Sequence, residues 1–204
     1  QQWVPSRLTA LIIAMVPVWL VLIEAARPGG VRPTWRVGAG IVVSFAGLVL
    51  LVGPGDLGGN VNLMGAGLIL LATLCWSSGS ILSRAVVLPA SPMLSTAMQM
   101  LAASVPLLLM GVLRGELGQV QPEAVSLKSL LGLAYLIVFG SIIAFTAYVW
   151  LLKVSEPARV GTYAYVNPVI AVVLGWGLNG EALTTQTLAG AALIWWGGFK
   201  IFER

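Results

Sequence analysis

The amino-acid sequence predicts an all-α polytopic membrane protein with about seven transmembrane helices, a number set by the apolar runs long enough to cross a bilayer. Hydrophobic residues make up 58% of the 204-residue chain and charged residues only 9%, whereas roughly a quarter of residues are charged in a soluble domain. Several uncharged runs approach the roughly 20 residues that a spanning helix needs. Glycine- and proline-rich segments separate these runs, as is typical of connections between helices.

Each predicted span is an apolar run that charged, proline or glycine residues bound on both sides. The first run is followed by the turn RPGGVRP and the second by GPGDLGGN. The third ends at Arg84, and RGELGQVQPEAVSLK, the longest connection, separates the fourth from the fifth. The sixth begins after Glu156, and LNGEALTT precedes the last. The predicted spans are residues 8–25, 37–53, 63–84, 93–113, 129–152, 158–178 and 186–202.

The positive residues predict the orientation of these spans. One side of the membrane collects Arg27, Arg32, Arg36, Arg84, Lys153, Arg159, Lys200 and Arg204, and the other collects Arg7, Arg114 and Lys128. Because cytoplasmic loops carry the excess of lysine and arginine, we expect the carboxyl end to be cytoplasmic. The chain starts at Gln1 rather than Met, and QQWVPSRLTALIIAM lacks the order of a signal peptide. We therefore expect an N-terminally truncated fragment of a longer protein.

The composition also excludes several classes of function. The eleven basic residues are scattered and form no block, so no nucleic-acid partner is predicted. With one cysteine, Cys75, and no histidine, the chain has no internal disulfide and little with which to hold a metal or run acid–base chemistry. We expect no cofactor. The expected partners are the lipid bilayer and a small-molecule substrate, and a homodimer is left open.

A faint internal repeat is the most informative feature. An offset of about 151 residues aligns Pro17 with Pro168, Gly29 with Gly180 and Gly47 with Gly198 without a gap. This offset crosses an odd number of predicted spans, so the two copies enter the membrane from opposite sides. Inverted repeats with interrupted helices near the midplane are typical of secondary transporters. We therefore predict that proline kinks or breaks both helices, at Pro17 and at Asn167–Pro168, and that the two helices face each other.

Three stretches carry a resemblance to a known family: LTALIIAMVPVWLVLIEAARPGG, LLATLCWSSGSILSR and FGSIIAFTAYVWLLKVSEPARVGTYAYVNPVIAVVLGWGLNGEALTTQTLAGAALI. They resemble the EamA-type drug/metabolite transporter superfamily, the third stretch most closely its drug/metabolite exporter branch. The resemblance implies ten spans in two inverted repeats of five. On that scheme residues 1–56 hold the last two spans of an incomplete first repeat, and residues 57–204 hold a complete second repeat. The Gly180–Glu181 pair has no acidic counterpart at Gly29–Gly30.

The strongest candidate for a substrate contact is Asn167, which precedes Pro168. Its amide can donate and accept, and Tyr163 lies one turn earlier on the same helix face. The functional interpretation is a polar patch that faces a central cavity. The alternative is that Asn167 only satisfies backbone groups freed by the proline. Pro17 is the matching residue in the first span, and Trp19 beside it offers either an aromatic cavity wall or a lipid contact.

Further candidates lie on helix faces in the third, fourth and fifth spans. Thr73, Trp76, Ser80 and Ser83 recur at helical spacing, and Ser77 lies beside them. Such hydroxyls line a cavity or bond to their own helix backbone, and both interpretations stay open. Gln99 should point inward, because an amide is costly in lipid. The predicted cavity residues are Pro17, Trp19, Trp76, Ser77, Ser80, Gln99, Ser141, Tyr148, Tyr163, Asn167 and Pro168.

Two more predictions concern the carboxylates and the small residues of the spans. Glu24, Glu156 and Glu181 lie at span ends, so no proton carrier is predicted within a span. We predict close helix packing at small-residue faces in the second and last spans, which contain Gly40, Ser44, Gly47, Gly190 and Gly197.

The predicted function is a secondary transporter that exports small organic metabolites or drugs across a bacterial plasma membrane by alternating access. Export and the bacterial inner membrane are implied by the resemblance alone. A first alternative is a seven-helix receptor or photoprotein, which needs a mid-span lysine with a counter-ion, whereas Lys200 lies near a span end. A second is an intramembrane enzyme, and a third is a non-transporting membrane fragment. A bound chromophore would favour the photoprotein, and hydrolysis of lipid or peptide probes would favour the enzyme.

Overall fold

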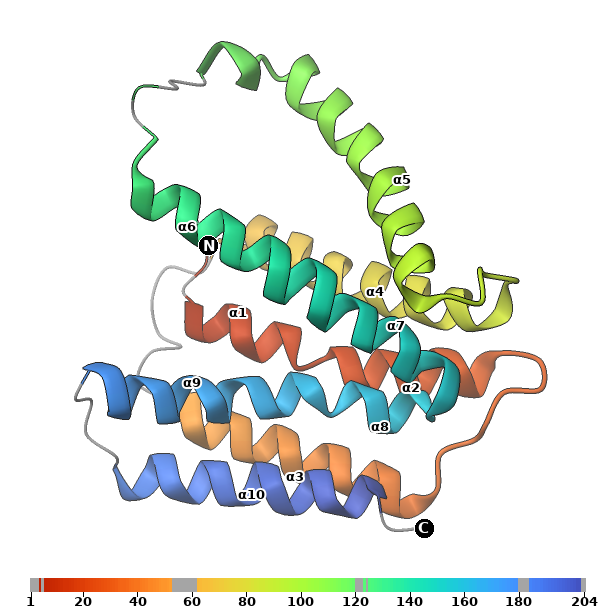
Figure 1. The fold of residues 1–204 in the computed structure, drawn as a ribbon. Coiled ribbons are helices and arrows are strands. Elements are labelled where there is room, and N and C mark those ends of the chain that lie inside the picture. The colour runs from red at the N-terminus through yellow and green to blue at the C-terminus, as the bar shows by residue number, and fades with distance from the viewer. Residues whose placement is uncertain are drawn as a thin grey trace. The chain divides into compact units, whose positions relative to one another are not determined.

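The computed structural model describes residue 4 and residues 6–52, 62–119, 123, 125–179 and 184–202, and this part of the chain is helical without strands (Figure 1). Its contacts divide the chain into two compact units. The first unit holds Gln1–Ala85 and Ser155–Arg204, and the second holds Val86–Val154. Each unit is described by itself.

The helices of the first unit follow the predicted spans closely. Its elements are α1 (Ser6–Ile13), α2 (Val16–Ala26), α3 (Trp35–Val52), α4 (Leu63–Ala85), α8 (Pro157–Gly161), α9 (Tyr163–Asn179) and α10 (Thr185–Phe202). The first predicted span is therefore the interrupted pair α1–α2, and the sixth is the interrupted pair α8–α9. Gly29 has a φ of 73° in the turn after α2, a left-handed conformation that glycine adopts without strain.

Four helical segments of the described chain are long and apolar enough to cross a membrane: Leu8–Ala26, Leu63–Ala85, Pro92–Leu113 and Leu127–Val154. Trp35–Leu51 is a shorter apolar helix. The fold class predicted from the sequence, an all-α polytopic membrane protein, is confirmed by this architecture. The helical segments also coincide with the seven predicted spans to within a few residues.

Helices α3 and α10 make the most extensive helix–helix contact of the described chain. They run antiparallel, because Gly40 meets Gly197 while Gly47 meets Gly190. A Cβ on Gly47 would lie 2.8 Å from the Gly190 carbonyl oxygen, so only glycine permits this approach. The hydroxyl of Ser44 donates to the Ile194 carbonyl oxygen at 3.3 Å between the two helices. The predicted close packing of the small-residue faces is confirmed.

Two apolar clusters hold the first unit together. The first contains Leu11, Ala14, Leu48, Tyr165, Ile194 and Ile201, and the second contains Val16, Leu20, Ile81 and Ala164. Both clusters join the α1–α2 pair to α9, on either side of the point where the first span is interrupted. The interruption therefore lies inside packed protein, where irregular backbone is tolerated at membrane depth.

The second unit holds α5 (Pro92–Leu113), the short 3₁₀ helix η2 (Glu116–Gln119), α6 (Leu127–Tyr135), the π-helix η4 (Leu136–Ala144) and α7 (Phe145–Val154). Ser91 and Ser126 cap α5 and α6, since each hydroxyl accepts a hydrogen bond from a backbone N–H of the first turn. No residue of α6 or η4 is buried. An apolar surface of this extent is incompatible with water and suits contact with lipid or with further protein.

Candidate functional site

The first broken helix is the α1–α2 pair. Ala14 and Met15 separate the two helices, and Pro17 lies in the first turn of α2, where its missing N–H costs nothing. The Met15 N–H bonds to the Ile12 carbonyl oxygen at 3.0 Å, three residues back instead of four. The break that the sequence predicted at Pro17 is therefore confirmed. The ring of Pro17 is fully buried.

The second broken helix is the α8–α9 pair, and its break lies elsewhere than predicted. Pro168 lies inside α9, which continues as one helix from Tyr163 to Asn179. The interruption falls at Thr162, whose N–H and hydroxyl both donate to the Arg159 carbonyl oxygen, at 3.2 and 2.7 Å. The prediction of a break at Asn167–Pro168 is therefore wrong, and its alternative, a kink at Pro168, stays a prediction. Proline removes one hydrogen bond in the helix interior, and packed neighbours allow the helix to continue past that defect.

The two broken helices cross at their breaks. A Cβ on Gly161, the last residue of α8, would lie 3.1 Å from the Cα of Pro17 and 3.0 Å from the Cδ1 of Leu20. The pairs run antiparallel, because Leu11 and Ala14 share a cluster with Tyr165, while Leu20 reaches back to Gly161. Figure 1 shows α1–α2 and α8–α9 running in opposite directions. Glycine at 161 is what allows the two backbones to approach this closely.

Helix α4 supplies hydroxyl groups beside the first break. The Ser77 Oγ is fully buried, 3.4 Å from the Val16 carbonyl oxygen and 2.9 Å from the Thr73 carbonyl oxygen. Because a hydroxyl has one proton, the shorter bond within α4 is the stronger of the two. Ser80 and Thr73 also donate to carbonyl oxygens of their own helix, at 2.7 Å each. These hydroxyls are satisfied within α4, and their role as a cavity lining stays a prediction.

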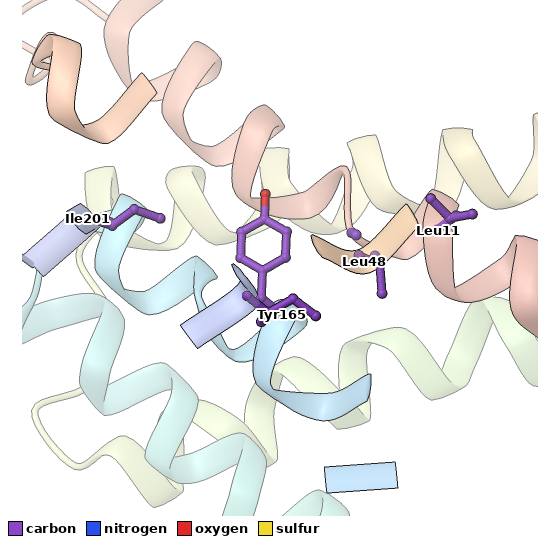
Figure 2. Packing of buried hydrophobic residues seen from close by; sticks show 6 residues of the cluster. Leu11, Leu48, Tyr165 and Ile201 are labelled. Carbon is purple, nitrogen blue, oxygen red and sulfur yellow. The ribbon is translucent and has the colours of Figure 1, made fainter. Parts of the chain in front are cut away.

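Tyr165 is a buried polar residue that the sequence analysis did not select. Its side chain is 1% exposed and stands between Ile201 on one side and Leu48 and Leu11 on the other (Figure 2). Its hydroxyl has no hydrogen-bond partner in the described part of the chain. Tyr163 and Asn167, the residues predicted from the sequence, lie on a different face of α9 from Tyr165. The signal that would have found Tyr165 is its spacing of four residues from Val169, which packs against the same cluster.

The remaining predicted cavity residues fall in different places. Asn167 is exposed and Pro168 is half-buried on α9, while Tyr163 packs against the second apolar cluster. Trp19 is half-buried with no partner for its Nε1 among described residues, and Trp76 is 42% exposed. Gln99, Ser141 and Tyr148 belong to the second unit; the Gln99 Nε2 donates to the Ser95 Oγ at 3.2 Å, and Tyr148 stacks on Phe145.

Interrupted helices that run antiparallel in a polytopic helical protein are typical of secondary transporters. Residues 63–202 match the EamA-like transporter family, which is more than half of the chain. The chain therefore belongs to the EamA-like transporter family, and it is a multi-pass membrane protein.

Individual relatives agree with this assignment. The chain is 39% identical over 183 residues to the uncharacterised inner membrane transporter YedA of Escherichia coli (strain K12), covering 90% of this chain and 57% of YedA. It is 27% identical to the probable amino-acid metabolite efflux pump of Salmonella typhimurium, covering 76% of this chain and 54% of the pump. The chain thus spans little more than half the length of these relatives.

A solved crystal structure shares the fold. It is similar over 98% of this chain and 68% of its own length, with a TM-score of 0.78. Its sequence identity of 22% means that the likeness concerns the fold alone.

Proposed function

We propose that the protein is a secondary transporter that moves small organic solutes across a bacterial plasma membrane by alternating access around the crossing of its broken helices. The observation that carries this proposal is the antiparallel contact of Gly161 with Pro17. Interrupted helices of opposite direction are where secondary transporters build their substrate sites. Membership of a transporter family supports transport over catalysis and over a seven-helix receptor.

The proposed direction is export, with the carboxyl end in the cytoplasm. The printed name of one relative, a metabolite efflux pump, supports export, and that of YedA supports an inner-membrane location. In the proposed architecture residues 1–56 are the last two spans of one five-helix repeat and residues 57–204 are the second repeat. Extended apolar contacts in the binding site would favour amphipathic solutes over small ions.

The test is uptake into inside-out vesicles that contain the complete protein, with a panel of amino acids, other metabolites and cationic dyes. Gly161→Ala places a methyl group 3.0–3.1 Å from Leu20 and Pro17, which must shift to make room for it, so it should slow transport. Gly177→Ala is the matched control, because nothing lies within 4 Å of a Cβ at this position of α9. Protein-dependent movement of no member of the panel, or equal transport by both variants, would count against the proposal.

A further inference from the structure

Three basic residues lie where α3 begins and α10 ends, at one corner of the first unit. A Cβ on Gly40 would lie 2.7 Å from the Ile201 Cγ1, so the start of α3 packs against the end of α10 (Figure 1). Arg36 precedes Gly40 by one helical turn and Lys200 directly precedes Ile201, so both cations flank this contact. Arg32 lies in the connection that enters α3. We call the surface that these three cations form the α3–α10 corner.

The charge of this corner is not neutralised by the carboxylates that the structure describes in the first unit. These carboxylates are Glu24 and Glu156, and each pairs with the arginine three residues further along the chain, at 3.2 and 3.9 Å. Arg32 and Arg36 form no ion pair within the described part of the chain. The corner therefore keeps a positive charge, which favours an anionic partner.

Exposed aromatic rings accompany two of the cations. Trp35 is 78% exposed at the start of α3, and Trp196 is 54% exposed near the end of α10. The Arg36 guanidinium carbon lies 5.9 Å from the centre of the Trp35 ring, and the Lys200 Nζ lies 5.8 Å from that of Trp196, both within the range of a cation–π contact. Because tryptophan is enriched at the level of the lipid headgroups, we place both cations at the depth of the lipid phosphates.

We propose that the α3–α10 corner binds the headgroup of an anionic phospholipid, whose phosphate oxygens accept hydrogen bonds from Arg36 and Lys200. Charge-assisted bonds to phosphate are strong, and a guanidinium can donate two in parallel. The indoles of Trp35 and Trp196 pack against the apolar part of the same lipid, a contact that a soluble phosphate cannot make. The corner lies on the side with the arginine excess, which we predict to be cytoplasmic, and the cytoplasmic leaflet is the anionic one. The inference goes beyond transport and does not depend on it.

The experiment titrates the purified protein in detergent with phosphatidylglycerol, phosphatidylcholine or glycerol 3-phosphate, and native mass spectrometry counts the bound molecules. The unaltered protein should bind phosphatidylglycerol more tightly than phosphatidylcholine. Each basic side chain near an anionic lipid contributes about fivefold in affinity, so the double variant Arg36→Gln/Lys200→Gln should bind phosphatidylglycerol about 25-fold more weakly. Its affinity for phosphatidylcholine should stay unchanged, because that headgroup has no net charge.

Two further variants separate the corner from the total charge of the protein. Arg114→Gln/Lys128→Gln removes the same charge from the second unit and should keep the preference for phosphatidylglycerol. The exchange Arg36→Lys/Lys200→Arg keeps both charges at the corner and should also keep the preference. A preference that persists in Arg36→Gln/Lys200→Gln, or that is lost in the exchange variant, overturns the inference. Glycerol 3-phosphate binding as tight as that of phosphatidylglycerol would assign the corner to a soluble anion and overturn it as well.

Discussion

Gly47→Ala on α3 is a direct test of the antiparallel contact between α3 and α10. The added Cβ would lie 2.7 Å from the Leu193 Cβ, 2.8 Å from the Gly190 carbonyl oxygen and 2.8 Å from the Ile194 nitrogen. Two of these three atoms belong to the backbone of α10, so a side-chain rotation cannot relieve the clash. The helices must move apart at this point.

The size of the effect follows from these distances. Ordinary contact begins near 3.4 Å, so the 2.7 Å approach to Leu193 requires a local separation of about 0.7 Å. Overpacking of this kind costs about 1–3 kcal/mol. The separation also stretches the bond from Ser44 to the Ile194 carbonyl oxygen, which contributes about 0.5–1.5 kcal/mol. The better helix propensity of alanine returns at most about 1 kcal/mol. We expect a net loss of about 0.5–4.5 kcal/mol.

The assay is equilibrium unfolding in mixed micelles with increasing dodecyl sulfate, followed by tryptophan fluorescence. Gly38→Ala is the matched control, because Gly38 belongs to the same helix and has nothing within 4 Å of its Cβ position. This control should be neutral or slightly stabilising. Equal stability of the two variants would refute the close approach of α3 and α10.

Four further outcomes are expected. Ser44→Ala should lower the free energy of unfolding in the same assay by about 0.5–1.5 kcal/mol, because the bond to Ile194 is lost. Pro168→Ala should raise stability by up to about 3 kcal/mol, because it restores a donor inside α9, whereas Pro17→Ala should lower it by removing a buried ring. A green fluorescent protein fused after Arg204 should fluoresce in bacterial cells if the carboxyl end is cytoplasmic; a dark fusion would reverse the predicted orientation.

Span positions were predictable because apolar length and flanking charge are local properties of the sequence. Close packing at the small-residue faces of the second and last spans was also predictable from residues such as Gly47 and Gly190, but the pairing of α3 with α10 was not. The break at Thr162 was not predicted. Proline is the stronger local signal for an interrupted helix, and it indicates Pro168. The interruption instead lies at Gly161 and at the hydroxyl of Thr162. The contact of Gly161 with Pro17 is tertiary, and no local pattern indicates it.

Two features of the structure depend on tertiary packing or on backbone geometry that composition does not encode. Glu24 lies at the end of a predicted span, where a carboxylate is ordinarily solvated, yet the packed unit buries it beside a cavity. The nine-residue π-helix Leu136–Ala144 has the composition of an ordinary apolar helix. π-Helical turns are frequent at functional sites, and this one contains Ser141, a predicted cavity residue whose role stays a prediction.

The two helix interruptions must have their free backbone groups satisfied within the protein. Lipid cannot satisfy free backbone groups, so an interrupted helix at membrane depth must be surrounded by protein or water. The α1–α2 pair meets this requirement, because the ring of Pro17 is buried and the Met15 N–H bonds to the Ile12 carbonyl oxygen. The α8–α9 pair meets it through the hydroxyl of Thr162, which donates to the Arg159 carbonyl oxygen. A Cβ on Gly161 would lie 3.0 Å from Leu20 and 3.1 Å from Pro17, so glycine at this position keeps the two interruptions in close contact.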